Sequence, residues 1–232
     1  LTFSTMVKRG KRRRSRDTKQ KNRGNTPRSN VIVTADDEFQ VHEWRSDIFQ
    51  EVPPPSDATI CHFQRSWQRL EQRKRRTLIP TPIQLHVWPV LTNSSKNIVG
   101  IAPTGSGKTL AYGLHLGHAL GNALVLVPTR ELARQVEKEL KTVSEKTIIC
   151  IYGGMDRSSQ VAALTEAIHS HQPWILAATT GRLVDVLEED SLPPFKVNSV
   201  ILDEADRMAS NVDMARQVDE ILKQLRDSNE EG

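Results

Sequence analysis

The sequence predicts an α/β fold in which a parallel, doubly wound sheet is covered by helices on both faces. From about residue 97 onward, short apolar segments of strand length alternate with longer segments whose apolar residues recur at helical spacing. Residues with reactive or polar side chains follow directly after the apolar segments. Such alternation is typical of a parallel sheet, and ligands of these sheets collect at the carboxyl ends of the strands.

Five strands are expected, because five short apolar segments are bounded by polar residues. They cover residues 97–102, 123–127, 147–152, 174–178 and 198–203. Apolar side chains that recur every three or four positions indicate helices between and after them. Two such faces are formed by Leu132, Val136, Leu140 and Val143, and by Val218, Ile221, Leu222 and Leu225.

The first 56 residues differ in composition from the rest. Residues 1–30 hold eleven Lys and Arg against one acid, Asp17, with few side chains that could form a core. We expect this stretch to be a disordered basic tail. Residues 31–56 form a connector that ends in three prolines at 53–55, which should stop any preceding helix. The predicted domains are therefore a tail and connector over 1–56 and one folded unit over 57–232.

Charge and cysteine content narrow the setting of the protein. The whole chain carries a net charge of +4, which is less than the net positive charge of residues 1–30 alone. The basic charge is therefore concentrated in the tail, and the rest of the chain is net acidic. Two separated cysteines, Cys61 and Cys150, predict neither a disulfide framework nor a zinc site and suit a reducing compartment. No segment has the roughly 18 to 20 apolar residues of a membrane span. We expect no membrane partner.

The basic run at residues 11–14 leaves three interpretations open. It could direct nuclear import, bind nucleic acid loosely, or be a solvated tail with no specific role. We expect the nucleus or nucleolus as location. The cytoplasm is the alternative, and an organelle is a weaker one, because the basic residues cluster instead of spacing along an amphipathic helix.

A phosphate-binding loop is predicted at residues 102–109, which read APTGSGKT directly after an apolar segment. Gly105 and Gly107 would let backbone N–H groups turn toward phosphate oxygens at a helix start. Lys108 would reach the β- and γ-phosphates, and Thr109 would ligate Mg²⁺. The expected nucleotide contacts in this loop are Ala102, Pro103, Thr104, Gly105, Ser106, Gly107, Lys108 and Thr109.

The tetrapeptide Asp-Glu-Ala-Asp at residues 203–206 follows another apolar segment, 200–202. An acid at the carboxyl end of a parallel strand can lie beside a phosphate loop and hold its magnesium ion. Taken alone, the tetrapeptide would more often be an acidic helix start that complements the helix dipole. The phosphate loop upstream favours the metal-binding interpretation.

Six motifs together carry a family resemblance. The chain resembles the first RecA-like domain of a DEAD-box ATP-dependent RNA helicase over roughly residues 60–226. The resemblance implies a RecA-like P-loop NTPase fold and ATP hydrolysis coupled to RNA unwinding or ribonucleoprotein remodelling. The alternatives are a P-loop NTPase of another class and a non-enzymatic RNA-binding product of a truncated gene. The motifs, in family order, are PTPIQ at 80–84, APTGSGKT at 102–109, PTRELA at 128–133, GG at 153–154, TTGR at 179–182 and DEAD at 203–206.

The resemblance implies roles in ATP hydrolysis, with ATP and Mg²⁺ as cofactors. Lys108 would supply positive charge, and Thr109 and Asp203 would hold Mg²⁺ largely through water. Glu204 would position the attacking water. Asp206 would couple the nucleotide site to other motifs and to a second domain.

Base recognition is assigned by the resemblance to Gln84, whose amide can distinguish adenine from guanine. The aromatic residue that packs near the base is expected to be Phe63, with Trp67 as the alternative. For either ring, packing inside the protein is the competing interpretation.

The remaining motifs are implied to bind RNA through its backbone, without reading sequence. Thr129 could be an ordinary helix cap, or serve both as a cap and as an RNA contact. Thr180 stands where the family usually has Pro. A cluster of basic residues at 65–76 could add an RNA contact or be a solvated face. The expected RNA-binding residues are Thr129, Arg130, Gly153, Gly154, Thr179, Gly181 and Arg182.

Two expected parts of a whole helicase were not found in the sequence, a Ser-Ala-Thr motif after residue 206 and a second RecA-like domain. We therefore expect a C-terminally incomplete monomer, with weak or no ATP turnover, because the second domain supplies arginine fingers worth about 10³ to 10⁵ in rate.

Overall fold

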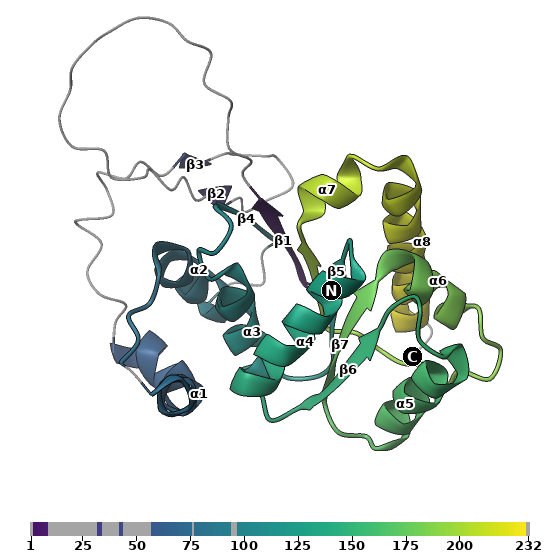
Figure 1. Ribbon diagram of the computed structural model, residues 1–232, viewed down its shortest axis with the longest axis horizontal. Coiled ribbons are helices and arrows are strands. Elements are labelled where there is room, and N and C mark those ends of the chain that lie inside the picture. The colour runs from purple at the N-terminus through teal and green to yellow at the C-terminus, as the bar shows by residue number, and fades with distance from the viewer. Residues whose placement is uncertain are drawn as a thin grey trace, which may run out of the picture.

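A computed structural model describes residues 2–8, 32–33, 42–43, 57–75, 77–93 and 97–230 (Figure 1). It has three layers, with one sheet between two groups of helices. Helices from the first half of the chain cover one face, and helices from the second half cover the other. The α/β class predicted from the sequence is confirmed.

The sheet has six parallel strands in the order β4-β1-β8-β5-β7-β6. Each of the five predicted strands is present, and no end differs from its predicted position by more than one residue. In spatial order the strands are Ile98–Ala102 (β4), Thr2–Lys8 (β1), Ser199–Asp203 (β8), Ala123–Val127 (β5), Trp174–Thr179 (β7) and Thr147–Ile151 (β6). A separate antiparallel pair joins Ile32–Val33 (β2) and His42–Glu43 (β3).

The prediction that residues 1–30 are disordered is wrong for Thr2–Lys8. This segment is β1, which pairs with β4 on one side and β8 on the other, so that Met6 lies opposite Gly100 and Asp203. Its sequence TFSTMVK is rich in β-branched, aromatic and other apolar residues, which favour strands. The basic residues that follow dominated the composition of the tail and hid this short pattern. The basic run at 11–14 lies outside the described residues.

Among the described residues, four helices lie on one side of the sheet and four on the other. The first group is Asp57–Lys74 (α1), Pro82–Asn93 (α2), Lys108–His118 (α3) and Arg130–Val143 (α4), and α1 packs on the other three helices rather than on the sheet. The second group is Arg157–His169 (α5), Thr180–Leu187 (α6), Ala205–Ala209 (α7) and Val212–Glu230 (α8). Helix α1 begins at residue 57, the predicted domain boundary. Strand β1, from the predicted tail, belongs to the same sheet as the strands that follow this boundary.

The apolar faces predicted for two helices form part of the two cores. Val136, Leu140 and Val143 of α4 are buried on one side of the sheet. Val218, Ile221 and Leu225 of α8 are buried on the other. Strand β5 is buried along its whole length between them. Because both faces are covered, the polar chemistry is left to the loops at the ends of the strands.

Within the described residues, no helix is long and apolar enough to cross a membrane. The same residues contain no cluster of three or more His, Cys, Asp or Glu side chains that could form a metal site by themselves.

Candidate functional site

The phosphate loop and the acidic tetrapeptide meet at the carboxyl ends of β4 and β8. Between them lies an open cavity of about 630 Å³. It brings together predicted residues that are about a hundred positions apart in the sequence. Its lining includes Thr104, Gly105, Gly107, Lys108, Thr109, Asp203 and Glu204.

The loop has the backbone of an anion-binding turn. Gly105 and Gly107 have φ angles of +77° and +86°, a region of backbone conformation that residues other than glycine rarely adopt. A Cβ atom on Gly107 would lie 2.5 Å from Nε2 of Gln84, so a side chain there would displace Gln84. Helix α3 begins immediately afterwards, and no side chain caps its N-terminus. Its first N–H groups and its dipole are therefore directed at the cavity.

Lys108 is buried at the base of the loop. Its Nζ atom donates hydrogen bonds to the carbonyl oxygens of Ala102 at 2.9 Å and Pro103 at 3.1 Å. The ammonium group is thus held inside the loop, where bound phosphate oxygens could accept its hydrogen bonds. Ser106 has a buried hydroxyl oxygen that makes no hydrogen bond with any described residue. A buried polar atom without a protein partner at this point fits a loop built around a polar ligand.

Asp203 is 3% exposed, and both of its carboxylate oxygens accept hydrogen bonds. Oδ2 accepts from the hydroxyl of Tyr112 at 2.9 Å, and Oδ1 accepts from the N–H of Glu204 at 3.0 Å. Burial raises the pKa of Asp203, and this effect is opposed by the Tyr112 hydrogen bond and the charge of Lys108. Sequence reasoning missed Tyr112, because a tyrosine at a helix position facing the core looks like an ordinary packing residue.

Glu204 occupies the left-handed region, with φ 55° and ψ 42°. A residue other than glycine pays about 1–3 kcal/mol for such a conformation, and such strain is concentrated at functional sites. The turn places Glu204 at the cavity directly after the buried Asp203, and Arg207 lies 3.7 Å from its carboxylate. Asp206 does not line this cavity among the described residues. Its coupling role stays a prediction.

Gln84 connects the loop to the segment before α2. Its Oε1 accepts from the N–H of Thr81 at 2.9 Å, and its Nε2 donates to the carbonyl oxygen of Gly107 at 3.1 Å. An amide carries a second N–H and a second lone pair, so one donor and one acceptor position remain for a base edge. Gln84 is 2% exposed and is not among the described residues that line the nucleotide cavity. Its adenine-reading role stays a prediction.

The prediction that Phe63 packs against the base is wrong. Phe63 is 2% exposed and belongs to a core cluster under α1, with its ring centroid 5.5 Å from that of Trp88. Trp67 also packs edge-on against Trp88, at 5.6 Å. The three rings bury a large apolar area at the junction of α1 and α2, which decided their placement. From α1, Leu70 and Lys74 line the nucleotide cavity instead.

Two members of the basic cluster on α1 hold that helix against α4 and the turn that follows it. Arg69 forms an ion pair with Glu145, and Arg73 donates to the carbonyl oxygen of Lys141 at 3.3 Å. These contacts favour a structural role for this face over an RNA contact.

The remaining motifs converge on a second, shallower cavity of about 520 Å³ at the ends of β5, β6 and β7. Six of the seven predicted RNA-binding residues line it, and the seventh, Gly154, follows Gly153 in the same loop. The lining includes Thr129, Arg130, Gly153, Thr179, Gly181 and Arg182.

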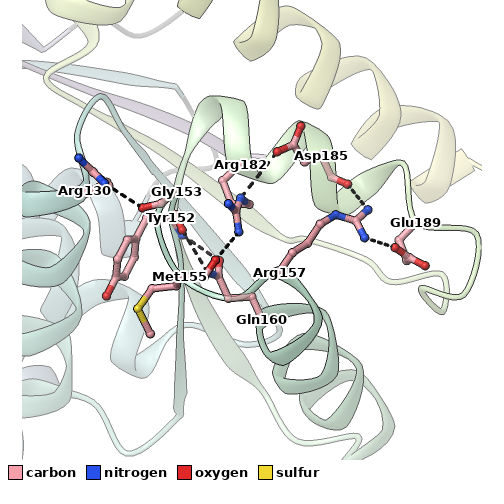
Figure 2. A network of polar contacts seen from close by, with 9 residues as sticks. All are labelled: Arg130, Tyr152, Gly153, Met155, Arg157, Gln160, Arg182, Asp185 and Glu189. Carbon is pink, nitrogen blue, oxygen red and sulfur yellow. Dashed lines mark hydrogen bonds and ion pairs between the residues drawn. The ribbon is translucent and has the colours of Figure 1, made fainter.

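Two arginines reach from separate helices to one loop (Figure 2). Arg130, the first residue of α4, donates to the carbonyl oxygen of Gly153 at 3.4 Å. Arg182, in α6, donates to the carbonyl oxygen of Met155 at 3.0 Å and lies 3.6 Å from the carboxylate of Asp185. Neither arginine was predicted to contact the glycine loop, because sequence spacing says nothing about which strand ends are neighbours.

The threonines of this cavity have local structural roles. Thr129 is the N-cap of α4 and accepts from the N–H of Leu132 at 3.2 Å, so the capping interpretation is confirmed. Thr180 is buried and its hydroxyl donates to Oε1 of Gln217 in α8 at 2.7 Å. This hydrogen bond ties α6 to α8 at the position where the family usually has Pro. Sequence reasoning missed Gln217.

Comparison with known proteins gives relatives of one kind. The chain is 41% identical over 140 residues to the ATP-dependent RNA helicase DBP3 of Saccharomyces cerevisiae, covering 56% of this chain and 25% of that protein. It is 34% identical over 194 residues to the dbp3 helicase of Neosartorya fischeri, covering 77% of this chain and 37% of that protein. The chain thus spans a quarter to two fifths of the length of these relatives.

Solved structures agree with these relatives. The crystal structure of the yeast DEAD-box splicing factor Prp28 matches with a TM-score of 0.62 at 32% identity, over 72% of this chain and 42% of that one. A DEAD box protein from Methanococcus jannaschii matches with a TM-score of 0.55 at 30% identity, over 67% of this chain and 43% of that one. The sequence model of the DEAD/DEAH box helicases matches residues 81–231, which is more than half of the chain. The chain belongs to the DEAD/DEAH box helicase family.

Proposed function

We propose that this chain is the ATP-binding part of an ATP-dependent RNA helicase, which unwinds RNA duplexes or remodels ribonucleoproteins. One observation carries the proposal. The nucleotide cavity and the second cavity lie at the same carboxyl edge of one parallel sheet, and the predicted motif residues line both. A ligand in either cavity therefore contacts loops fixed to the same set of strands.

The residues of the nucleotide cavity fit ATP with Mg²⁺. A bound Mg²⁺ would supply positive charge that offsets the charge of the phosphates. Thr109 and Asp203 would hold the ion, largely through its water ligands. Lys108 donates hydrogen bonds to the phosphates. The carboxylate of Glu204 accepts a hydrogen bond from the attacking water and so orients it. Gln84 selects adenine.

The second cavity fits the backbone of a single RNA strand. Arg130 and Arg182 present guanidinium groups, and the glycine loop allows a strand to approach closely. We expect these groups to contact phosphate and sugar, so that binding is independent of sequence.

RNA-stimulated ATP hydrolysis tests this proposal. The 232-residue chain is assayed alone and joined through a linker to the second RecA-like domain of a DEAD-box relative. We expect slow turnover by the chain alone and strong RNA stimulation of the joined protein. Glu204→Gln should abolish the stimulated rate while ATP stays bound. A joined protein that binds ATP and RNA but shows no stimulation would contradict the proposal.

A nuclear or nucleolar location is a further part of this proposal, supported by the basic run at residues 11–14. Residues 1–30 fused to a fluorescent protein should accumulate in the nucleus, and a variant with these four residues changed to Ala should not. A diffuse wild-type fusion would contradict it. We also propose that the chain is a monomer, which light scattering can test.

A further inference from the structure

The loop from Tyr152 to Met155 is held by three side chains from three different helices (Figure 2). The carbonyl oxygen of Tyr152 accepts from Gln160 of α5, that of Gly153 from Arg130 of α4, and that of Met155 from Arg182 of α6. Three of the four carbonyls in this short loop are therefore bonded to side chains. The loop is a common attachment point for the elements that line the second cavity.

Gln160 is attached to the loop by two hydrogen bonds. It is 7% exposed, although it is polar, and it bonds to both peptide groups of one residue. Its Nε2 donates to the carbonyl oxygen of Tyr152 at 3.1 Å, and its Oε1 accepts from the N–H of Tyr152 at 3.0 Å. An amide side chain that bonds in this paired way imitates the next strand of a sheet. It extends the ordered edge of β6 by one residue and fixes the direction in which the chain enters Gly153.

The two arginines depend on the position of this loop. Each guanidinium group has five N–H donors, and its hydrogen bond to the loop occupies only one of them. The planar group is oriented by the bond it makes, so the loop determines how the remaining donors face the cavity. A Cβ atom on Gly154 would lie 2.6 Å from Nη1 of Arg130, so the loop and this arginine are also in close contact.

Arg157 of α5 also takes part in the network, on the side away from the loop. It donates to the carbonyl oxygen of Asp185 at 2.7 Å and pairs with the carboxylate of Glu189, while Asp185 itself lies beside Arg182. This part of the network connects α5 to α6 away from the loop. Gln160 is the attachment from α5 to the loop itself.

We propose that Gln160 is a positioning residue for RNA binding, which holds the Tyr152–Met155 loop so that Arg130 and Arg182 face one RNA strand together. This inference rests on the proposed function, because it concerns the same RNA-binding cavity. Gln160 itself contacts no RNA. Its loss weakens RNA binding by releasing the loop, without changing the charge of either arginine.

Gln160→Glu is the sharpest test, because the two side chains have nearly the same shape. The introduced carboxylate can accept from the N–H of Tyr152 but cannot donate to its carbonyl oxygen. We expect the affinity for a labelled single-stranded RNA, measured by fluorescence anisotropy at pH 8, to fall about tenfold, since a buried hydrogen bond is lost. The affinity for Mg²⁺-ADP should not change.

Lowering the pH should rescue this variant. The introduced carboxyl is buried against a carbonyl oxygen, which raises its pKa, and once protonated it can donate again. We expect the ratio of wild-type to variant affinity to shrink toward one between pH 8 and pH 5.5. Gln172→Glu on an exposed turn adds the same charge and is the matched control, with no loss and no rescue expected.

A second variant separates the hydrogen bonds from the charge. Gln160→Met has a similar volume and should lose RNA affinity at both pH values. Arg182→Gln should weaken binding in the wild type and weaken it less in the Gln160→Met background, because the loop that orients Arg182 is already released.

The outcomes distinguish the two proposals. Wild-type protein that binds no RNA would overturn the proposed function and this inference with it. Wild-type protein that binds RNA, together with folded Gln160 variants of unchanged RNA affinity, would overturn the inference alone. Equal loss of RNA and ADP affinity in both variants would also overturn it, because that pattern indicates general loss of structure.

Discussion

The hydroxyl of Tyr112 donates a 2.9 Å hydrogen bond to Oδ2 of Asp203, and both side chains are buried. The bond joins α3, the helix after the phosphate loop, to the end of β8. Because Oδ1 is held by the N–H of Glu204, the carboxylate of Asp203 is fixed at both oxygens. An acid oriented in this way can hold the water shell of a magnesium ion without first having to be ordered.

Tyr112→Phe removes this hydroxyl and keeps the ring in the core. A hydrogen bond to a charged group contributes about 1.5–3 kcal/mol to stability. Part of this free energy should be lost from ADP binding when Mg²⁺ is present. We expect the affinity for ADP to fall about tenfold in Mg²⁺ and to be unchanged in EDTA. The measurement is a fluorescence titration with a labelled ADP in both buffers. An equal loss in both buffers would show that the hydroxyl supports the fold rather than the acid.

The ionised carboxylate of Asp203 should lower the unfolding free energy of the chain without ligand. Burial raises its pKa, so the folded protein favours the protonated form more than the unfolded protein does. Stability should therefore fall as pH rises from the ordinary Asp pKa through the raised value, and the cost is fully present at neutral pH. Asp203→Asn should raise the melting temperature at pH 7 by a few degrees and abolish stabilisation by Mg²⁺-ADP. A lower melting temperature, with the same pH profile as wild type, would contradict this.

Gly153 and Gly154 offer a matched pair of substitutions. Gly154 has a φ of +91°, and a Cβ atom there would lie 2.6 Å from Nη1 of Arg130, whereas a Cβ on Gly153 would meet nothing within 4 Å. Gly154→Ala should cost about 1 kcal/mol in unfolding free energy and weaken RNA binding. Gly153→Ala should be close to neutral in stability. Urea unfolding and RNA anisotropy measure the two effects, and equal behaviour of the pair would count against this loop geometry.

The position of β1 in the middle of the sheet can be tested with proline. Every N–H of a strand between two neighbours faces one of them, so Thr5→Pro must remove a hydrogen bond and also strain the strand. We expect the melting temperature to fall by about 5 °C or more. Lys19→Pro, in the basic tail, should leave it unchanged. If both variants melt like wild type, β1 does not contribute to the stability of the sheet.

The sequence was sufficient to predict five strands, because each is a short apolar segment between polar boundaries. It was also sufficient to bring many of the motif residues to the two cavities, because the motifs fall at strand ends and parallel strands bring those ends to one edge. Strand β1 was missed because its seven residues were considered together with the basic composition of residues 1–30 as a whole. Its partners, β4 and β8, lie about a hundred and two hundred positions away.

The contacts that cross between elements could not be predicted. Phe63 was assigned to the base, although Trp88 was available as a packing partner once α1 and α2 met. Tyr112, Gln160 and Gln217 each bond to a residue whose proximity depends on the order of strands and helices. One sequence contains no information on such pairs beyond their chemical compatibility.

The affinity of the chain for ADP and GDP, measured by titration of wild type and Lys108→Ala, tests the central claim most directly. Lys108 and the loop around it should bind the phosphates, and Gln84 should favour adenine. We predict that ADP binds more tightly than GDP and that Lys108→Ala loses about tenfold to a hundredfold in ADP affinity. Lys223→Ala, on the exposed side of α8, should behave as wild type. Equal affinity for both nucleotides, or unchanged ADP affinity in Lys108→Ala, would contradict the account.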